Sequence, residues 1–313
     1  MKLVIQIPCL NEEQTLPAVL QSIPRRIAGV DEIIILVIND GSTDKTVEVA
    51  KEHGVTHFVH HIGNKGLAQS FKDGVAYSLK IGADIVVNTD GDNQYPQAKI
   101  GELIAPIIAG TADMVIADRQ VKTIEHFSRG KKFFQWLGTK VLNAAAGTQV
   151  PDAPSGFRAY SRETLLQLNI VTRFSYAMET LIQAGNKRIR IASVPIKTNP
   201  KTRESRLFNS SLEHMAKSGI AISRSFIMHK PYMLFVPLGL TLFLLGLVPF
   251  ARFIYFVIQD SGEGHLQSLV IGSVLLIIAF TTLTLGVIAD LIRINRILIE
   301  DQLEQQRRIH YKQ

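Results

Sequence analysis

The chain has 313 residues, enough for one large domain or for one domain with an appendage. Its hydrophobic fraction of 46% is high for a purely soluble protein, and its formal charge of +7 is local, because residues 187–230 hold ten Lys or Arg against two Glu. Neither a nucleic-acid-binding module nor an interleaving of basic with aromatic residues accompanies this charge, which excludes nucleic acid as the expected partner. The single cysteine, Cys9, excludes an intramolecular disulfide.

Short apolar runs alternate with longer mixed segments over the first 120 residues. The runs are typical of strands and cover residues 3–7, 33–38, 55–59, 85–87 and 114–117. The segments between them place apolar residues at three- and four-residue spacing, which indicates helices at 12–26, 44–52 and 67–81. This alternation predicts an α/β fold with a mostly parallel sheet covered by helices on both faces. A dinucleotide-binding Rossmann domain is disfavoured, because no G-x-G-x-x-G follows the first strand.

Helical patterns dominate after residue 120. They predict helices at 127–146, 162–168 and 176–185, followed by a late strand at 190–194. Trp136 lies in the first of these helices, where packing or interfacial anchoring is the ordinary explanation. A basic amphipathic helix is expected at 209–228, in the plane of lipid headgroups.

Two uncharged segments follow, at residues 232–251 and 266–289. They are 20 and 24 residues long, and each can cross a hydrocarbon core of ~30 Å. The alternative is a pair of central helices in a soluble core. The connection between them has two acids and no Lys or Arg, whereas basic residues flank the outer ends, so both termini and the large domain are expected in the cytoplasm. The expected division is a cytosolic domain at 1–208, an interfacial helix at 209–230, a transmembrane hairpin at 231–292 and a cytosolic tail at 293–313.

The stretch from Asp84 to Pro96 carries the clearest chemical signal. Its apolar run ends in two carboxylates, Asp90 and Asp92, and a further oxygen donor, Gln94, follows. Ligands of open α/β sheets bind beyond the carboxyl ends of the strands, so these oxygens suit a hard divalent cation, Mg²⁺ or Mn²⁺. A cation held by two or three protein oxygens keeps positions open for the phosphates of a substrate.

Polar residues also end the first two strands, in the sequences IPCLNEE and VINDGSTD. Asp40 is expected to accept a hydrogen bond from a base or a ribose hydroxyl, whereas a turn and a helix N-cap explain residues 42–44 better than ligand contact does. Four histidines cluster nearby with no acidic or cysteine partner, which disfavours zinc: His53, His57, His60 and His61.

The sequences IPCLNEE, NDGSTD, GNKGLAQS and TDGDNQYP, in this order, resemble the family 2 glycosyltransferases of GT-A fold. The resemblance is strongest to the polyprenyl-phosphate sugar synthases, such as the dolichol-phosphate mannose synthases, and covers roughly the first 210 residues. The two apolar segments also resemble the two-helix anchor of the bacterial polyprenyl-phosphate glycosyltransferases. The resemblance implies a nucleotide-sugar donor, a divalent metal at the D-x-D-like motif and inverting transfer by the domain at 1–208.

The resemblance also implies roles for individual residues. The metal and the diphosphate would be held by Asp90, Asp92 and Gln94, the last matching the D-x-D-x-Q variant of the lipid-phosphate branch. The nucleotide sugar would be bound by Pro8, Asn11, Glu12, Asp40, Lys65, Asp90, Gly91 and Asp92. Residues 63–70 would line the nucleotide side through their backbone, and a solvated loop lysine is the alternative for Lys65.

On the acceptor side, Arg119 and Arg129 resemble family positions that grip an acceptor phosphate, and with Asp92 they form the expected catalytic set. Arg158, Arg203 and Arg206 would extend this basic wall, with attraction to lipid headgroups as the alternative for each. An acceptor phosphate is already an anionic nucleophile, so it needs orientation more than a general base. Asp118 and Glu179 remain candidate bases, and structural roles explain them equally well.

The expected function is transfer of one hexose from a nucleotide-diphosphate sugar to a polyprenyl phosphate at the cell membrane. The mark of processive polysaccharide synthases, Q-x-x-R-W, is absent, which favours transfer of a single sugar. Two alternatives stay open. One is a transferase acting on another membrane acceptor, a diacylglycerol or a lipid-linked glycan, and the other is a non-catalytic nucleotide-sugar-binding membrane protein. The oligomeric state is open, and a homo-oligomer is compatible with the sequence.

Overall fold

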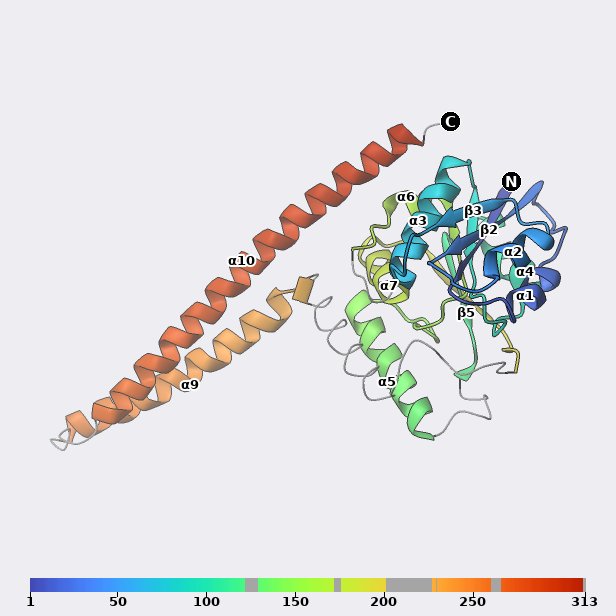
Figure 1. Ribbon diagram of the computed structural model, residues 1–313. Coiled ribbons are helices and arrows are strands. Elements are labelled where there is room, and N and C mark those ends of the chain that lie inside the picture. Colours follow the sequence, from blue (N-terminus) through green and yellow to red (C-terminus); the bar gives the residue numbers. More distant parts are fainter. Residues whose placement is uncertain (122–128, 172–175, 201–226, 229, 260–265, 312–313) are drawn as a thin grey trace. The chain divides into compact units, whose positions relative to one another are not determined.

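The computed structural model describes the chain except for residues 122–128, 172–175, 201–226, 229, 260–265 and 312–313. The chain divides into two compact units, and Figure 1 shows both. The first unit holds Met1–Ile222 together with Leu303–Gln313, and the second holds Ser223–Gln302. Most of the helix expected at 209–230 lies outside the described residues, as do Arg203 and Arg206.

The first unit is built on a seven-stranded sheet of order β3-β2-β1-β4-β6-β5-β7. Neighbouring strands run parallel except for β6, which is antiparallel to both β4 and β5. The predicted mostly parallel sheet is therefore confirmed. The strands are β1 (Lys2–Cys9), β2 (Glu32–Asn39), β3 (His57–His60), β4 (Ile85–Asn88), β5 (Met114–Asp118), β6 (Arg158–Ser161) and β7 (Ile191–Pro195).

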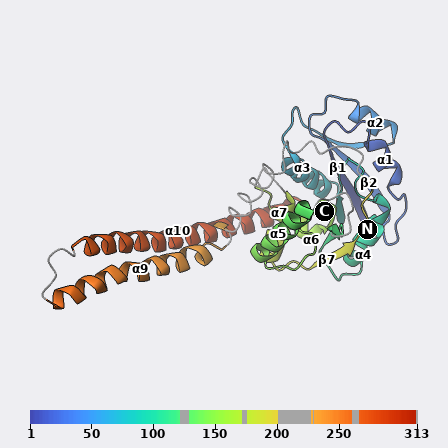
Figure 2. The same cartoon turned by 90° about the horizontal axis from the view of Figure 1, so that it is seen from below.

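Helices cover both faces of this sheet, as Figure 2 shows for α3 on one side and α1 and α4 on the other. Alternate residues of β1 point to opposite faces: Leu3, Ile5 and Ile7 join the core under α1 and α4, whereas Gln6 faces Gly74 of α3. The helices of this unit are α1 (Leu16–Ser22), α2 (Thr46–Glu52), α3 (Leu67–Lys80), the 3₁₀ turn η1 (Gln97–Lys99), α4 (Ile100–Ile108), α5 (Arg129–Ala146), α6 (Arg162–Gln167) and α7 (Tyr176–Asn186).

The second unit consists of two long apolar helices, α9 (Tyr232–Ile258) and the first part of α10 (Leu266–His310). Both are long and apolar enough to cross a membrane. Glycines allow the two helices to approach closely: a side chain at Gly246 would meet Leu276, and one at Gly272 would meet Phe250. The predicted span at 266–289 lies within α10, which continues without a break to His310. The segment expected as a tail is thus helical.

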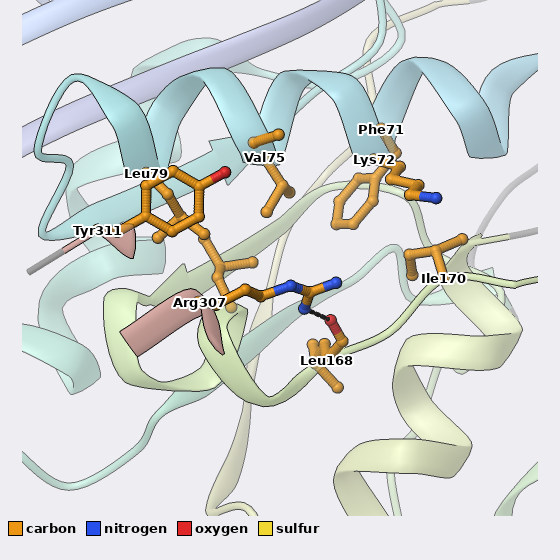
Figure 3. Close-up of a pocket in the computed structure, with 10 residues that line it drawn as sticks. Phe71, Lys72, Val75, Leu79, Leu168, Ile170, Arg307 and Tyr311 are labelled. Carbon is orange, nitrogen blue, oxygen red and sulfur yellow. Dashed lines mark hydrogen bonds between the residues drawn. The ribbon is translucent and has the colours of Figure 1, made fainter. Parts of the chain in front are cut away.

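The last turns of α10 belong to the first unit and contact α6 and the residues that follow it. Arg307 Nη1 donates a hydrogen bond of 2.6 Å to the carbonyl oxygen of Leu168, just beyond the end of α6, where helix carbonyls lack partners within the helix. Arg308 pairs with Glu163. Figure 3 shows Arg307 and Tyr311 lining a cavity of about 70 Å³ against α3. This volume holds only a few water molecules, so the cavity is too small for a substrate site.

Candidate active site

The loops that follow β1, β2 and β4 meet at one edge of the sheet, because these three strands are parallel neighbours. Thr15 Oγ1 donates a 2.8 Å hydrogen bond to the carbonyl oxygen of Gly91 and joins the first loop to the acidic motif. Gly91 itself packs so closely that a Cβ there would lie 3.2 Å from Cys9 Sγ and 3.3 Å from Glu12 Cγ. The structure therefore brings the first and fourth sequence motifs together.

Asn11 and Glu12 fix the loop after β1. Asn11 has a left-handed backbone with φ of 56°, and its side-chain oxygen accepts a 2.8 Å hydrogen bond from the Thr43 amide. Glu12 is buried, and its Oε2, 2.7 Å from Thr15 Oγ1, shares the hydroxyl proton of Thr15 with the Gly91 carbonyl. Both residues thus tie the first motif to its neighbours, and their contact with a nucleotide stays a prediction. Pro8 lies within β1, opposite Ile38 of β2.

Asp40 lies at the end of β2 and is almost completely buried. Its carboxylate accepts hydrogen bonds from the amides of Lys65 and Gly66, at 2.8 and 2.9 Å. Its Oδ1 also lies 2.7 Å from Nδ1 of the buried His61, whose Nε2 lies 3.1 Å from Asp73 Oδ2. The carboxylate therefore holds the start of α3 and is itself held by His61. A base or ribose that contacts Asp40, as the sequence predicts, would share this carboxylate with His61, Lys65 and Gly66.

His61 was expected to lack an acidic partner, but it has two in the structure, Asp40 just after β2 and Asp73 on α3. These carboxylates are 21 and 12 residues away in the chain, so the local sequence pattern could not reveal them. The loop that they hold lies directly against Gly41, where a Cβ would be 2.7 Å from the backbone of Gly63. The loops after β2 and β3 therefore form one layer, which we call the donor shelf and define as residues 40–44 and 61–66.

The acidic motif forms a tight turn after β4. Asp92 accepts two hydrogen bonds from Gln94, one from its backbone amide at 3.1 Å and one from its side-chain Nε2 at 2.7 Å. Asn199 follows β7, and its side-chain Nδ2 donates a hydrogen bond of 2.9 Å to the Asn93 carbonyl oxygen. Its backbone amide donates one of 3.0 Å to the Gln94 carbonyl oxygen. The turn is thus held from both sides. Asn199 was not among the residues expected from the sequence, because it lies more than 100 residues away from its partners.

The donor set of this turn fits a hard divalent cation. The side chains of Asp90, Asp92 and Gln94 can offer oxygen atoms, which Mg²⁺ and Mn²⁺ prefer. Within the described residues no group of three or more His, Cys, Asp or Glu side chains could hold a metal ion. The residues that would hold such a cation are Asp90 and Asp92, with positions left open for the oxygens of a substrate. In this geometry Gln94 acts on Asp92 as a hydrogen-bond donor, and its contact with a metal stays a prediction.

Two buried tyrosines form the floor beneath Asp90. The Tyr95 hydroxyl accepts a 3.1 Å hydrogen bond from the Gly156 amide, and the Tyr176 hydroxyl donates one of 3.1 Å to the Gly156 carbonyl. A Cβ on Gly156 would lie 3.0 Å from the Tyr176 hydroxyl and 3.5 Å from Asp90 Oδ2. Burial raises the pKa of Tyr95 to about 12, and the charge of Asp90 adds to this rise. Burial likewise raises the pKa of Tyr176, so both hydroxyls stay protonated at neutral pH.

Arg119 forms a two-pronged ion pair with the buried Asp152, through Nε at 2.7 Å and Nη2 at 2.8 Å. Burial alone would lower the pKa of Arg119, but the hydrogen bonds to Asp152 raise it, so the guanidinium is permanently charged. Nη1 lies outside this pair, and the side chain is 17% exposed. Asp152 was not among the residues expected from the sequence, because it lies 33 residues beyond Arg119. The contact of Arg119 with an acceptor phosphate stays a prediction.

Arg158 occupies a different environment from the one expected for an acceptor ligand. It lies on β6, and its side chain is fully buried. Its guanidinium donates to the carbonyl oxygens of Ser155, Ala177 and Ala153 at 2.6–2.7 Å, and to Thr180 Oγ1 at 2.9 Å. We therefore assign Arg158 a structural role in place of the acceptor contact expected from the sequence.

The remaining candidates are distributed as follows. Arg129 begins α5, and Lys65 is an exposed residue whose backbone amide binds Asp40. Asp118 is the last residue of β5 and accepts a 2.8 Å hydrogen bond from the Gln120 amide. Glu179 is buried on α7 and accepts one of 3.1 Å from the Val171 amide. These contacts give both carboxylates a structural role.

Comparison with known proteins identifies the class of protein that has this fold and these motifs at the carboxyl edge of its sheet. The model of the family described as glycosyl transferase family 2 matches residues 4–168. An undecaprenyl-phosphate mannosyltransferase of Micrococcus luteus is 28% identical over 206 residues, which cover 63% of this chain and 83% of that protein. A dolichyl-phosphate hexose transferase of Haloferax volcanii is 29% identical over 205 residues, which cover 66% of this chain and 86% of that protein.

Among solved structures, glucosyl-3-phosphoglycerate synthase from Mycobacterium tuberculosis, in complex with Mn²⁺ and uridine-diphosphate-glucose, is similar with a TM-score of 0.55 at 27% identity. The match covers 72% of this chain and 78% of that chain. The sheet and its acidic edge thus define a glycosyltransferase of GT-A type. The chain belongs to glycosyl transferase family 2, which confirms the resemblance carried by the four motifs.

Proposed function

We propose that this glycosyltransferase moves one hexose from a nucleotide-diphosphate sugar to a polyprenyl phosphate at the cytoplasmic face of a membrane. The observation that carries the proposal is the junction of Asp90 and Asp92 with the loop of Asn11 and Glu12, through Thr15 and Gly91. The contact between the acidic turn and the polar loop after β1 supports a nucleotide and its cation at this edge of the sheet. The relatives named for transfer to undecaprenyl and dolichyl phosphate support the choice of acceptor.

In this proposal Asp90, Asp92 and Gln94 hold Mg²⁺ or Mn²⁺. When bound, the cation neutralises the charge that develops on the leaving diphosphate. The donor shelf lies under the nucleotide, with its backbone fixed by Asp40 and His61. The tyrosine hydroxyls beneath Asp90 stay neutral and add no further negative charge beside the diphosphate.

The acceptor phosphate is oriented in this proposal by Arg119 and Arg129. Asp152 holds Arg119 in one geometry and leaves Nη1 outside the ion pair. The acceptor then attacks the anomeric carbon from the face opposite the leaving group, so an α-linked donor gives a β-linked product. A phosphate monoester is anionic at neutral pH, and the reaction needs no carboxylate base.

The rival acceptors, a diacylglycerol or a lipid-linked glycan, present a hydroxyl that a base must deprotonate. We therefore expect Asp118→Asn and Glu179→Gln, made separately, to retain transfer to within about threefold once folding is equal. The choice of acceptor is measured directly by comparing transfer to a short-chain polyprenyl phosphate, to the corresponding polyprenol and to diacylglycerol. Product formed with polyprenyl phosphate, and with neither of the other two acceptors, supports the proposal. A loss of several orders of magnitude in one folded variant, with a hydroxyl acceptor used, would establish the rival.

His61 provides a test of the donor shelf. We expect His61→Ala to raise the KM for the nucleotide sugar roughly 10-fold or more with a smaller change in kcat, because Asp40 loses a buried partner and the loop of Lys65 and Gly66 loosens. His60→Ala is the matched control, since this neighbouring side chain is exposed. Steady-state kinetics with varied donor measure both. An unchanged donor KM in a folded His61→Ala enzyme would remove His61 from the account of donor binding.

The proposed topology places both termini and the catalytic unit in the cytoplasm, with α9 and the first part of α10 crossing the membrane. Its support is the two apolar helices and the basic residues that flank the hairpin, against a connection that carries two acids and no Lys or Arg.

A further inference from the structure

Helix α5 exposes an unusually apolar surface for a helix of the sheet-containing unit. Phe133 is 53% exposed and Trp136 45% exposed. The exposed large apolar side chains of this helix are Phe133, Phe134, Trp136, Leu137 and Val141, which we call the α5 face. Elsewhere in the described part of this unit, such side chains are scattered, at Met1, Ile62, Val171, Leu303 and Ile309. A contiguous apolar surface of this kind marks a binding site, whereas scattered apolar residues do not.

The opposite side of α5 packs against the rest of the unit, whereas the described residues leave the α5 face exposed. Leu142, Ala145 and Ala146 are buried, and Gly185 of α7 leaves no room for a side chain against the Ala146 carbonyl. The C-terminal half of α5 is thus fixed on α7, and Figure 1 shows its N-terminal half extending beyond α7. The helix is therefore apolar on two sides, and only one of them is covered by the described residues.

The chemistry of the α5 face favours a lipid surface as its occupant. Trp136 is an aromatic residue of the kind enriched at membrane interfaces, and Lys140 Nζ lies over its ring, 4.6 Å from the centroid. An exposed lysine beside apolar residues can extend its ammonium group to lipid phosphates while its stem stays among the acyl chains. The chain also carries two helices able to cross a membrane, which keep this unit close to a bilayer. Exposed aromatic residues and a cation on a membrane-bound chain complement an anionic lipid surface.

We propose that the α5 face inserts into the headgroup region of the membrane, with the rings of Phe133, Phe134 and Trp136 and the side chain of Leu137 among the upper acyl segments. The contact would hold the catalytic unit against the bilayer through a surface separate from α9 and α10. It does not depend on which sugar or acceptor the enzyme uses.

Trp136 is the single tryptophan of the chain, so its fluorescence reports on this face alone. The full chain is reconstituted into vesicles of phosphatidylcholine and phosphatidylglycerol in equal parts, with bromine on the acyl chains either near the headgroup or near the terminal methyl. We expect quenching by the shallow bromine at least about twice as strong as by the deep one, and protection from aqueous iodide. Trp136→Phe gives the background signal.

Two substitutions sharpen the test. Leu137→Glu is expected to reduce the quenching by shallow bromine at least twofold, and Phe133→Ser, a milder change, to act in the same direction. Ile62→Glu places the same charge on an exposed apolar residue of another loop and should leave the quenching unchanged. Circular dichroism and thermal unfolding verify that each variant is folded.

Three outcomes are distinguishable. The proposal is supported if brominated lipid quenches Trp136 emission and this quenching decreases in Leu137→Glu and Phe133→Ser. Trp136 emission that is insensitive to brominated lipid and open to iodide overturns it. Emission protected from iodide yet insensitive to brominated lipid also overturns it, and shows that protein covers the α5 face. Reconstitution at less than one chain per vesicle then distinguishes a second copy from another part of the same chain.

Discussion

Replacing Asp92 by alanine is expected to reduce sugar transfer by at least about 1,000-fold without unfolding the protein. A bound cation supplies several kcal/mol of charge stabilisation to the leaving diphosphate, and each 1.4 kcal/mol corresponds to about tenfold in rate. The fold should persist, because Asp92 is only half-buried and accepts hydrogen bonds from Gln94 within the same turn. Transfer of a labelled hexose and thermal unfolding measure the two effects.

Asp84→Ala is the matched control for this change. Asp84 precedes the amino end of β4, whereas Asp92 follows its carboxyl end, and the Asp84 carboxylate accepts a hydrogen bond from the Lys2 amide at the opposite edge of the sheet. Binding of Mn²⁺, followed by electron paramagnetic resonance, should weaken in Asp92→Ala and stay unchanged in Asp84→Ala. Equal transfer by Asp92→Ala and the unaltered enzyme would remove Asp92 from the catalytic site. Transfer by neither would leave only a nucleotide-sugar-binding role for the protein.

Replacing Arg158 by lysine is expected to destabilise the fold by at least about 3 kcal/mol, because buried carbonyl groups lose their donors. Lysine retains the positive charge but cannot reach the oxygens of Ser155, Ala177 and Ala153 together. For a unit of this size the loss corresponds to a fall in Tm of roughly 6–12 °C. Thermal unfolding of the purified full chain provides the measurement.

Arg190→Lys provides the comparison, since Arg190 pairs with Asp113 at the surface with 59% of its side chain exposed. An exposed ion pair contributes less than about 1 kcal/mol, so this variant should unfold close to the unaltered protein. A stable Arg158→Lys enzyme with a raised KM for polyprenyl phosphate alone would contradict the structural role and restore the acceptor contact expected from the sequence.

Much of the sheet was predictable, because buried parallel strands are continuously apolar. The run at 33–38 lies within β2, and the run at 85–87 lies within β4. The strand β6 was not predicted, since its four residues begin with an arginine that sequence reasoning places on a basic surface. Only the packing of α7 and the preceding loop around Arg158 makes that residue a buried one, and this packing joins segments about 20 residues apart.

The candidate site was predictable in its motifs and not in the contacts that hold them. Asp90, Asp92 and Asp40 follow apolar runs, so their place at one edge of the sheet followed from topology. Asp152 and Asn199 left no signal, because each acts on a partner far away in the chain through a geometry that no local spacing encodes. Tyr95 was within the recognised motif, but its place beneath Asp90 depends on burial against Phe157. The two rings are stacked, with their centroids 5.2 Å apart.

The most direct measurement is transfer from a panel of labelled nucleotide-diphosphate sugars to a short-chain polyprenyl phosphate by the purified full chain, with Mn²⁺ or Mg²⁺ and with the cation chelated. The proposed function predicts one preferred donor, a single sugar joined to the lipid phosphate, and loss of product on chelation that added cation restores. Product formed equally with the cation chelated, or a sugar joined only to a hydroxyl acceptor, would contradict it.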